Sequence, residues 1–259
     1  MRTATGFALA VLTALVVAAP AAAATGHADG YIPAVAHTAG RFGSFWTSDV
    51  WIYQQGATVV HLWFNRMDED SSAEQSVVVD LDQPVVELSD IVATVFGTEG
   101  VGSVHYLADG PVSVVSRTWT ADPEGGSYGQ TVPGVPLELA SYAGGGQGGT
   151  LRMLVDQQAG TRANLGLVNV SPVAIRVLVE IFGADGQPVA GDSSFTVDLP
   201  AFGMTQVGDV LARLPAGQRH GLIIRAGVTS AEGGVMAYLS EVDNTTNDAS
   251  YQEAFRFAF

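Results

Sequence analysis

The chain contains no cysteine and no lysine, and both absences limit what it can be. Without cysteine it has neither disulfides nor thiol chemistry, so its stability must come from packing. All 11 basic residues are arginines against 26 acidic residues, which gives a formal net charge of −15. That charge argues against nucleic acid and anionic lipid surfaces as partners.

Apolar runs of about 18 residues, the length needed to span a membrane as a helix, are also lacking after residue 24. Residues 1–24 have the pattern of a secretory signal peptide: a basic start, an apolar run at 6–20, and Ala22 and Ala24 at the cleavage site. We therefore expect a secreted, extracellular or cell-surface bacterial protein, with the periplasm as the alternative location. The mature chain should have no transmembrane segment.

The chain aligns with itself in several places that keep the same order, which indicates an internal duplication. The matching segments are 32–35 with 132–135, 60–64 with 175–179, 77–81 with 195–199, 87–92 with 206–211, and 127–128 with 250–251. We therefore predict a first unit at 25–131, a glycine-rich linker or entry segment at 132–149, and a second unit at 150–259.

Both copies alternate apolar and polar residues with the period of a half-buried strand, as at 60–64 and 175–179. Nothing between the strands is long enough for the crossover helices of a parallel sheet. The predicted fold is all-β, with two tandem antiparallel β-sandwich (immunoglobulin-like) units, each with one short helix.

The predicted helices occupy matching places in the two units. In the first, Ser89 or Asp90 is expected to cap a turn that stops at Gly97. In the second, the helix starts near Asp209 and ends before Pro215.

Two further segments carry a resemblance: HTAGRFGSFW at 37–46 and VDNTT at 242–246. With them the chain resembles uncharacterised secreted bacterial proteins built from tandem immunoglobulin-like or fibronectin type III-like β-sandwiches. The resemblance implies the fold and implies no particular activity. The paired cysteines of true immunoglobulin domains are missing here.

The aromatic residues indicate where the protein could bind a partner. By the strand register, Trp63 points away from the core beside His61, and Phe45 and Trp46 end an aromatic loop. An outward tryptophan is typical of an interface anchor or a sugar-stacking platform. The alternative is that Trp63 packs under the second unit or under a covering loop.

The end of the chain alternates Phe255, Phe257 and Phe259 with small or charged residues, which predicts a strand with one aromatic face. One interpretation is an assembly strand that adds to an exposed edge of a neighbouring molecule. The alternative is a strand that closes the second sandwich.

Two oxygen-rich loops are weak candidates for calcium binding. Asp68 and Asp70 lie in one, and Asp243 and Asp248 in the other. Neither loop has the glycine and glutamate pattern of an EF-hand, and polar turns between strands are ordinary. No pair of histidines has a spacing typical of zinc sites.

The segment GGSYG at 125–129 matches the G-x-S-x-G motif of α/β-hydrolases, with His220 downstream. That motif requires a helix directly after the serine, but Pro133 and Pro136 follow, so Ser127 is expected in a loop. We name no catalytic residue, and a serine hydrolase is a remote alternative.

The sequence thus predicts an exported, non-enzymatic protein for extracellular binding or adhesion, or a structural component of the cell surface. Its partner would be a cell-surface or extracellular macromolecule. The alternative is a self-assembling fibre or surface-layer subunit, whose partner is the protein itself. No cofactor is expected other than calcium.

Overall fold

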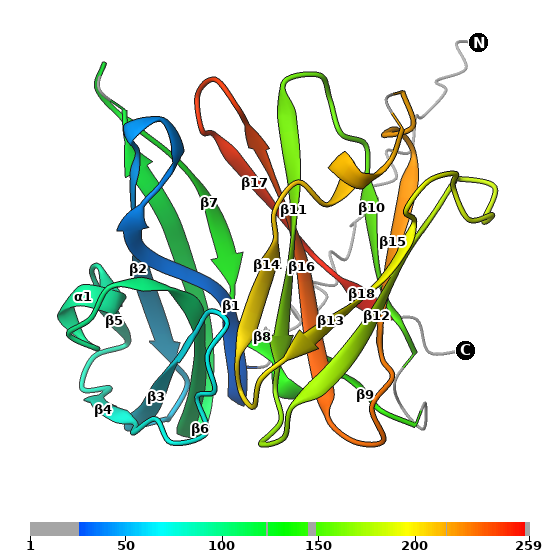
Figure 1. The fold of residues 1–259 in the computed structure, drawn as a ribbon. Coiled ribbons are helices and arrows are strands. Elements are labelled where there is room, and N and C mark those ends of the chain that lie inside the picture. Colours follow the sequence, from blue (N-terminus) through cyan, green and yellow to red (C-terminus); the bar gives the residue numbers. More distant parts are fainter. Residues whose placement is uncertain (1–25, 123, 145–148, 216, 257–259) are drawn as a thin grey trace, which may run out of the picture.

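The computed structural model describes residues 26–122, 124–144, 149–215 and 217–256, and over these ranges the protein is all-β (Figure 1). The predicted signal peptide, Phe257 and Phe259 lie outside the described residues. The helical segments are single turns: η1 (Arg41–Gly43), α1 (Ile91–Thr94), η2 (Leu137–Leu139) and η3 (Val210–Arg213). None of the helical segments in the described ranges has the length or hydropathy to cross a lipid bilayer.

The first unit is built from β1 to β8, all paired antiparallel. Their bounds are β1 (His27–Ala39), β2 (Phe45–Gln54), β3 (Val59–Arg66), β4 (Val77–Asp80), β5 (Val85–Leu88), β6 (Gly100–Ala121), β7 (Ser127–Pro133) and β8 (Val135–Pro136). The predicted alternation on β3 is confirmed, since Val60, Leu62 and Phe64 are buried in the core of this unit.

Strand β6 is 22 residues long and belongs to both layers of the first unit. Its first half pairs with β3 and β1, and its second half pairs with β2 and β7. The apolar side chains of the core lie between these two halves. One continuous strand therefore ties the two layers of this sandwich together.

The second unit consists of two separate antiparallel sheets, β13-β12-β15-β10-β18 and β14-β11-β16-β17, with β9 beside β16. The strands are β9 (Ser141–Tyr142), β10 (Leu151–Val155), β11 (Thr161–Asn169), β12 (Ile175–Phe182), β13 (Ser194–Leu199), β14 (Met204–Val207), β15 (Leu222–Val228), β16 (Gly234–Asp243), β17 (Ala249–Glu253) and β18 (Phe255–Arg256). Their facing apolar side chains form the core of this unit.

The two units share one strand order. The neighbours β4-β3-β6-β1 and β5-β2-β6-β7 correspond to β13-β12-β15-β10 and β14-β11-β16-β17. Even the short edge strands correspond, because β8 pairs with β1 as β18 pairs with β10. A duplicated unit would leave this correspondence, and the duplication itself remains a prediction about ancestry.

Each unit has its helical turn at the predicted place, but the predicted side-chain cap is wrong. Asp90 and Asp209, which precede α1 and η3, have left-handed backbones with φ of 47° and 43°, and neither side chain caps the turn. Their backbone N–H groups donate to the Asp49 carboxylate (2.9 Å) and to the Asn164 side-chain oxygen (3.0 Å). A cap requires an extended backbone at that position, which these aspartates lack.

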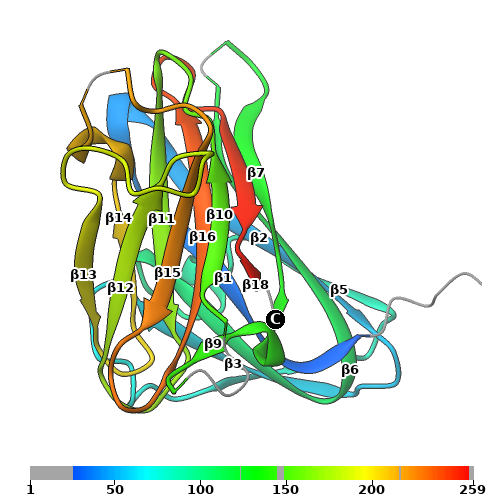
Figure 2. The same cartoon turned by 90° about the vertical axis from the view of Figure 1, so that its right-hand side faces the viewer.

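The sheet β14-β11-β16-β17 is the middle layer of the molecule, between the other sheet of the second unit and the first unit (Figures 1 and 2). Its central strands are buried along most of their length. On β16, Ala237 and Leu239 face the core of the second unit, whereas Met236 and Tyr238 face the first unit. A strand covered on both sides loses the alternation that marks a half-exposed one.

The two units pack against each other through a shared apolar cluster. Tyr31 and Ala34 of β1 and Val135 of β8 lie there with Met204 and Tyr238 of the second unit. All five side chains are buried. Burial of this kind is the main favourable contribution to association, so we expect the two units to behave as one body.

Backbone contacts extend this interface to the loop that follows β3. The N–H of Asp68 donates to the carbonyl of Met204 (2.8 Å), and the N–H of Ser71 donates to that of Ala201 (3.0 Å). The segment 132–149, expected to be a linker, includes the end of β7, β8, η2 and β9. The chain therefore crosses between the units through short paired strands.

Candidate functional site

The predicted pair Trp63 and His61 lies on the outer face of β3, half-buried, beside β6 and β1. The indole of Trp63 stacks on His61 (ring centroids 6.0 Å apart) and on His105 (5.0 Å). His105 stacks in turn on the buried ring of Tyr31 (4.6 Å), and its Nε2 contacts the Asp29 carboxylate (2.8 Å).

These stacking contacts decide what Trp63 can do. A sugar-binding platform offers an open ring face to its ligand, but the indole is flanked by two imidazoles. Its outward direction was predicted correctly, while the neighbours that cover it come from strands distant in the sequence. The ladder of Trp63, His105 and Tyr31 leads from the surface into the interface between the units, so packing explains it well.

Phe45 and Trp46 are not brought together with Trp63. In the sheet, Trp46 lies opposite Thr38 near the end of β1, whereas His105 lies opposite Tyr31 near its start. The seven residues between Tyr31 and Thr38 span roughly 20 Å of strand. Phe45 is exposed and meets His37 edge to face (4.9 Å).

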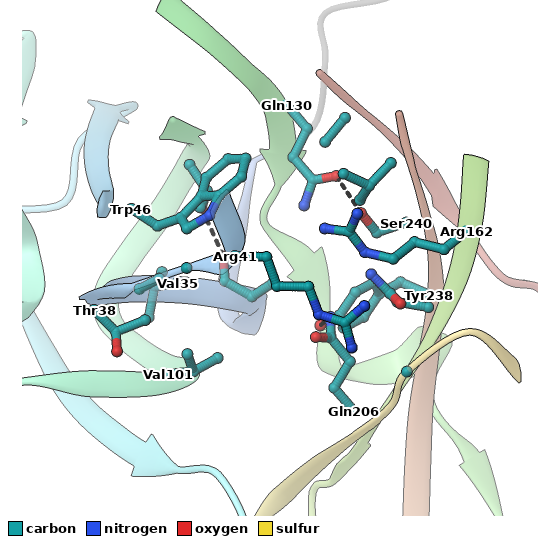
Figure 3. Close-up of a pocket in the computed structure, with 18 of the residues that line it drawn as sticks. Val35, Thr38, Arg41, Trp46, Val101, Gln130, Arg162, Gln206, Tyr238 and Ser240 are labelled. Atoms are coloured by element: carbon teal, nitrogen blue, oxygen red, sulfur yellow. Dashed lines mark hydrogen bonds between the residues drawn. The ribbon is translucent and has the colours of Figure 1, made fainter. Parts of the chain in front are cut away.

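Trp46 forms part of a different site, a pocket between the two units (Figure 3). The cavity has a volume of about 270 Å³. The first unit contributes Arg41, Trp46 and Gln130 to its wall, and the second contributes Arg162, Gln206 and Ser240. Ser240 Oγ donates to Gln130 Oε1 across the interface (2.7 Å), which fixes the two walls relative to each other.

The wall of the second unit depends on one glycine. Tyr238 of β16 lies opposite Gly166 of β11, and a side chain at Gly166 would overlap the ring of Tyr238. The Tyr238 hydroxyl accepts a hydrogen bond from Gln206 Nε2 (3.3 Å), and its ring stacks on Tyr251 (5.4 Å). Burial raises the pKa of Tyr238 far above its ordinary value, so this hydroxyl stays neutral.

Two arginines, Arg41 and Arg162, lie in the wall of the pocket. Burial lowers the pKa of the Arg162 guanidinium, the neighbouring charge of Arg41 lowers it further, and Asp209 raises it. Sequence reasoning missed Arg41 and Arg162, since no spacing in the chain connects them. Concave sites with a few converging polar groups are the usual places where proteins bind small ligands.

The four carboxylates proposed for calcium are occupied by their own loops or by the interface. Asp68 accepts a hydrogen bond from Thr205 Oγ1 of the second unit, and Asp70 accepts one from the N–H of Ser72 (2.9 Å). In the other loop, Asp243 accepts bonds from the N–H groups of Thr245 (2.7 Å) and Thr246 (2.8 Å), and Asp248 accepts one from the N–H of Ala249 (3.1 Å). These bonds lower the pKa of Asp70 and of Asp243. In the described ranges, no three His, Asp or Glu side chains gather as a metal site would require.

Of the proposed assembly strand, Phe255 is the residue within the described ranges. It lies on β18, 53% exposed, and β18 pairs with β10 at the edge of its own sheet. Arg256 Nη1 donates to the carbonyls of Glu138 (3.0 Å) and Ala140 (3.1 Å). This strand therefore closes the second unit and still presents one aromatic side chain to solvent.

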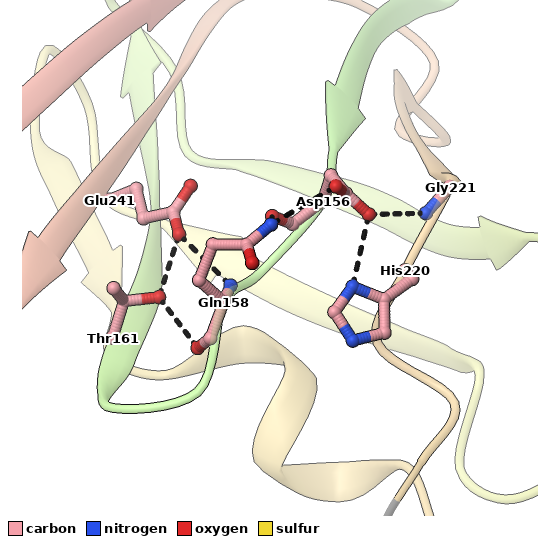
Figure 4. A network of polar contacts seen from close by, with 6 residues as sticks. All are labelled: Asp156, Gln158, Thr161, His220, Gly221 and Glu241. Atoms are coloured by element: carbon pink, nitrogen blue, oxygen red, sulfur yellow. Dashed lines mark hydrogen bonds and ion pairs between the residues drawn. The ribbon is translucent and has the colours of Figure 1, made fainter.

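Ser127 and His220 belong to unrelated parts of the fold. Ser127 begins β7 in the hairpin after β6, and its Oγ accepts a hydrogen bond from Arg117 (2.7 Å). His220 Nδ1 contacts the Asp156 carboxylate (3.1 Å), which also accepts a bond from the N–H of Gly221 (Figure 4). The G-x-S-x-G motif is thus part of a β-hairpin, where it has no strand-to-helix turn.

The other hydrogen bonds of this network hold a turn in place. Glu241 accepts hydrogen bonds from Thr161 Oγ1 (2.6 Å) and from the N–H of Gln158 (3.3 Å) (Figure 4). It fastens the turn between β10 and β11 to β16. The Thr161 hydroxyl donates to the Glu241 carboxylate and to the Gln158 carbonyl (3.1 Å). It is therefore not paired with His220 as a nucleophile would be with its base.

Comparison with protein-family models and with curated proteins found no match for this chain. The function of the chain therefore has to be inferred from the residues of the pocket.

Proposed function

We propose that this is an exported, non-enzymatic binding protein that holds a small polar ligand, or one residue of an extracellular polymer, in the pocket between its two units. The observation that carries the proposal is the composition of the pocket: an indole and several hydrogen-bonding side chains converge there from both units (Figure 3). Its volume of about 270 Å³ is just below the usual range for drug-sized ligands, roughly 300–1,000 Å³.

The outer face around Trp63 supports this function less well. Its indole is covered by imidazoles, whereas Trp46 lies in the wall of a cavity. The proposed extracellular location rests on the signal-peptide pattern of the sequence. The proposed non-enzymatic role rests on the position of Ser127 and His220 in separate parts of the fold.

The matched pair of variants Trp46→Leu and Trp63→Leu tests the position of the site. Both remove a half-buried indole from the first unit, so each is a control for the other. Binding to purified cell-envelope glycans, measured as retention on immobilised material, should be lost in Trp46→Leu and kept in Trp63→Leu. The reverse outcome would place the site on the outer face, and loss in neither variant would reject the pocket.

The alternative, self-assembly, is favoured by one observation, the exposed Phe255 on an edge strand. Edge strands readily accept a strand from a neighbouring molecule. Light scattering should then report large species for the full chain and monomers for Phe255→Ser, which leaves the Arg256 contacts in place. Equal sizes for both proteins would remove this alternative.

A further inference from the structure

The charge of the pocket is opposite to the charge of the protein. The chain carries 26 acidic residues against 11 arginines, yet among the described residues that line the pocket none is an aspartate or a glutamate. Two of the arginines, Arg41 and Arg162, are in its wall (Figure 3). Asp209, which is outside this lining, acts on the Arg162 charge, but no ion pair joins either arginine to a carboxylate among the described residues.

Three other arginines of the second unit form ion pairs, Arg176 with Asp198, Arg213 with Asp192 and Arg225 with Glu180. Arg256 instead donates to backbone carbonyls. In the part of the chain that the structure describes, the Arg162 side chain has one hydrogen-bond partner, the neutral side-chain oxygen of Asn244 (2.6 Å). Within the same ranges, the Arg41 guanidinium has neither a hydrogen-bond nor an ion-pair partner. Most of the N–H donors of the two guanidiniums are therefore available to a ligand.

The two like charges repel each other across the cavity wall, although Arg41 is exposed and water screens part of this repulsion. A negative group placed between the two guanidiniums would replace this repulsion by attraction. The guanidinium is a planar fork that matches the oxygens of carboxylate, phosphate or sulfate in pairs. The neutral donors Gln130 and Gln206 and the flat wall of Trp46 suit the uncharged remainder of a sugar-like molecule.

We propose that the pocket between the units is an oxyanion site, in which Arg41 and Arg162 together hold a carboxylate, phosphate or sulfate group of the ligand. This inference rests on the proposed function and names the chemical class of its ligand. Uronic-acid residues, glycerol phosphates and sulfated sugars of extracellular polymers share this chemistry.

Calorimetric titration of the mature protein with galacturonate, glycerol phosphate and inorganic sulfate distinguishes the three sources, and galactose and glycerol are the neutral counterparts of the first two. We expect at least one anion to bind, and galacturonate or glycerol phosphate, where it binds, to bind more tightly than its neutral counterpart. Arg41→Met and Arg162→Met should each weaken that binding roughly 10- to 100-fold, as expected for loss of a charged hydrogen bond. Arg176→Met removes the same charge from an exposed ion pair outside the pocket and should bind as the wild type does.

A second measurement, the shift in Tm on addition of the anion, also detects weak binding. Sulfate stabilises most proteins by exclusion from their surface, so the informative quantity is the shift in Tm of the wild type minus that of the double variant Arg41→Met/Arg162→Met. A specific site predicts a positive difference at millimolar sulfate or phosphate, and added sodium chloride should reduce it by screening.

The possible failures are distinguishable. Equal binding of galacturonate and galactose, lost in Trp46→Leu but not in the arginine variants, would overturn the oxyanion site and leave the proposed function standing. Anion binding that survives in the double variant would place the anion elsewhere and overturn the inference. No heat from any anion, together with no difference in the Tm shift, would overturn it as well.

Discussion

The apolar cluster between the units predicts that the protein unfolds as one body, and Met204 provides the test. Met204 is fully buried in that cluster, and its carbonyl also accepts the N–H of Asp68 from the first unit. Met204→Ala keeps the backbone contact and removes most of the side chain from the interface. Replacing a buried methionine by alanine costs about 2–5 kcal/mol, which corresponds to a fall in Tm of roughly 5–15 °C for a chain of this size.

Differential scanning calorimetry separates coupled from independent units. At roughly 0.7 kcal/mol per residue, about 230 residues unfolding together absorb about 160 kcal/mol in one transition, with equal calorimetric and van't Hoff enthalpies. Met204→Ala should shift this whole transition downward. Ile181→Ala, which lies in the core of the second unit alone, should do the same if the units are coupled.

Two resolved transitions in the wild type, each with about half of that enthalpy, would show that the units unfold independently. So would a variant Ile181→Ala in which only part of the heat absorption moves and a component stays at the original temperature. Either result would mean that the units pack together at this cluster without linking their stabilities.

Three smaller predictions concern single residues near the pocket. Gly166→Ala should destabilise the protein by about 1–3 kcal/mol, as overpacking does, because the new methyl group overlaps the ring of Tyr238. Urea unfolding measures this loss, and an unchanged midpoint would contradict the close packing. Tyr251→Phe should stabilise the protein by up to about 1 kcal/mol, because the Tyr251 hydroxyl is buried without a hydrogen-bond partner among the described residues; a clear loss of stability in urea would contradict this. Burial raises the pKa of the Glu253 carboxyl, so the protein loses stability as pH rises through this folded-state pKa. Glu253→Gln should therefore raise Tm at pH 7, and this gain should vanish below the ordinary pKa of 4.5. A gain that persists in acid would rule out ionisation as its cause.

The sequence predicted the half-exposed strands and failed where strands are covered twice. On β3 and β12, apolar and polar residues alternate because one face meets the core and the other meets water. On β16 the face that carries Met236 and Tyr238 packs against the first unit. Both faces of this strand are therefore apolar, and the sequence does not show which face lies in the interface. The contact between the units was for that reason invisible in the periodicity.

Of the residues that line the pocket, Trp46 alone was named as a candidate from the sequence. Trp46 was singled out as an aromatic loop residue, but Arg41, Arg162 and Gln206 join it through the packing of two units. Residues so far apart in the chain have no common spacing for a pattern search to find. Trp63 shows the opposite error, since its direction followed from the register while the rings that cover it did not.

The continuous strand β6 has a consequence for how a ligand would be received. Because it runs unbroken through both layers of the first unit, those layers resist sliding past one another, and the Ser240–Gln130 contact anchors the opposite wall to β7, the neighbour of β6. If the pocket binds a ligand as proposed, its walls are already in place, and little conformational entropy of the protein is lost on binding. A molecule of similar chemistry but different shape should then bind more weakly, because its binding would require these walls to move.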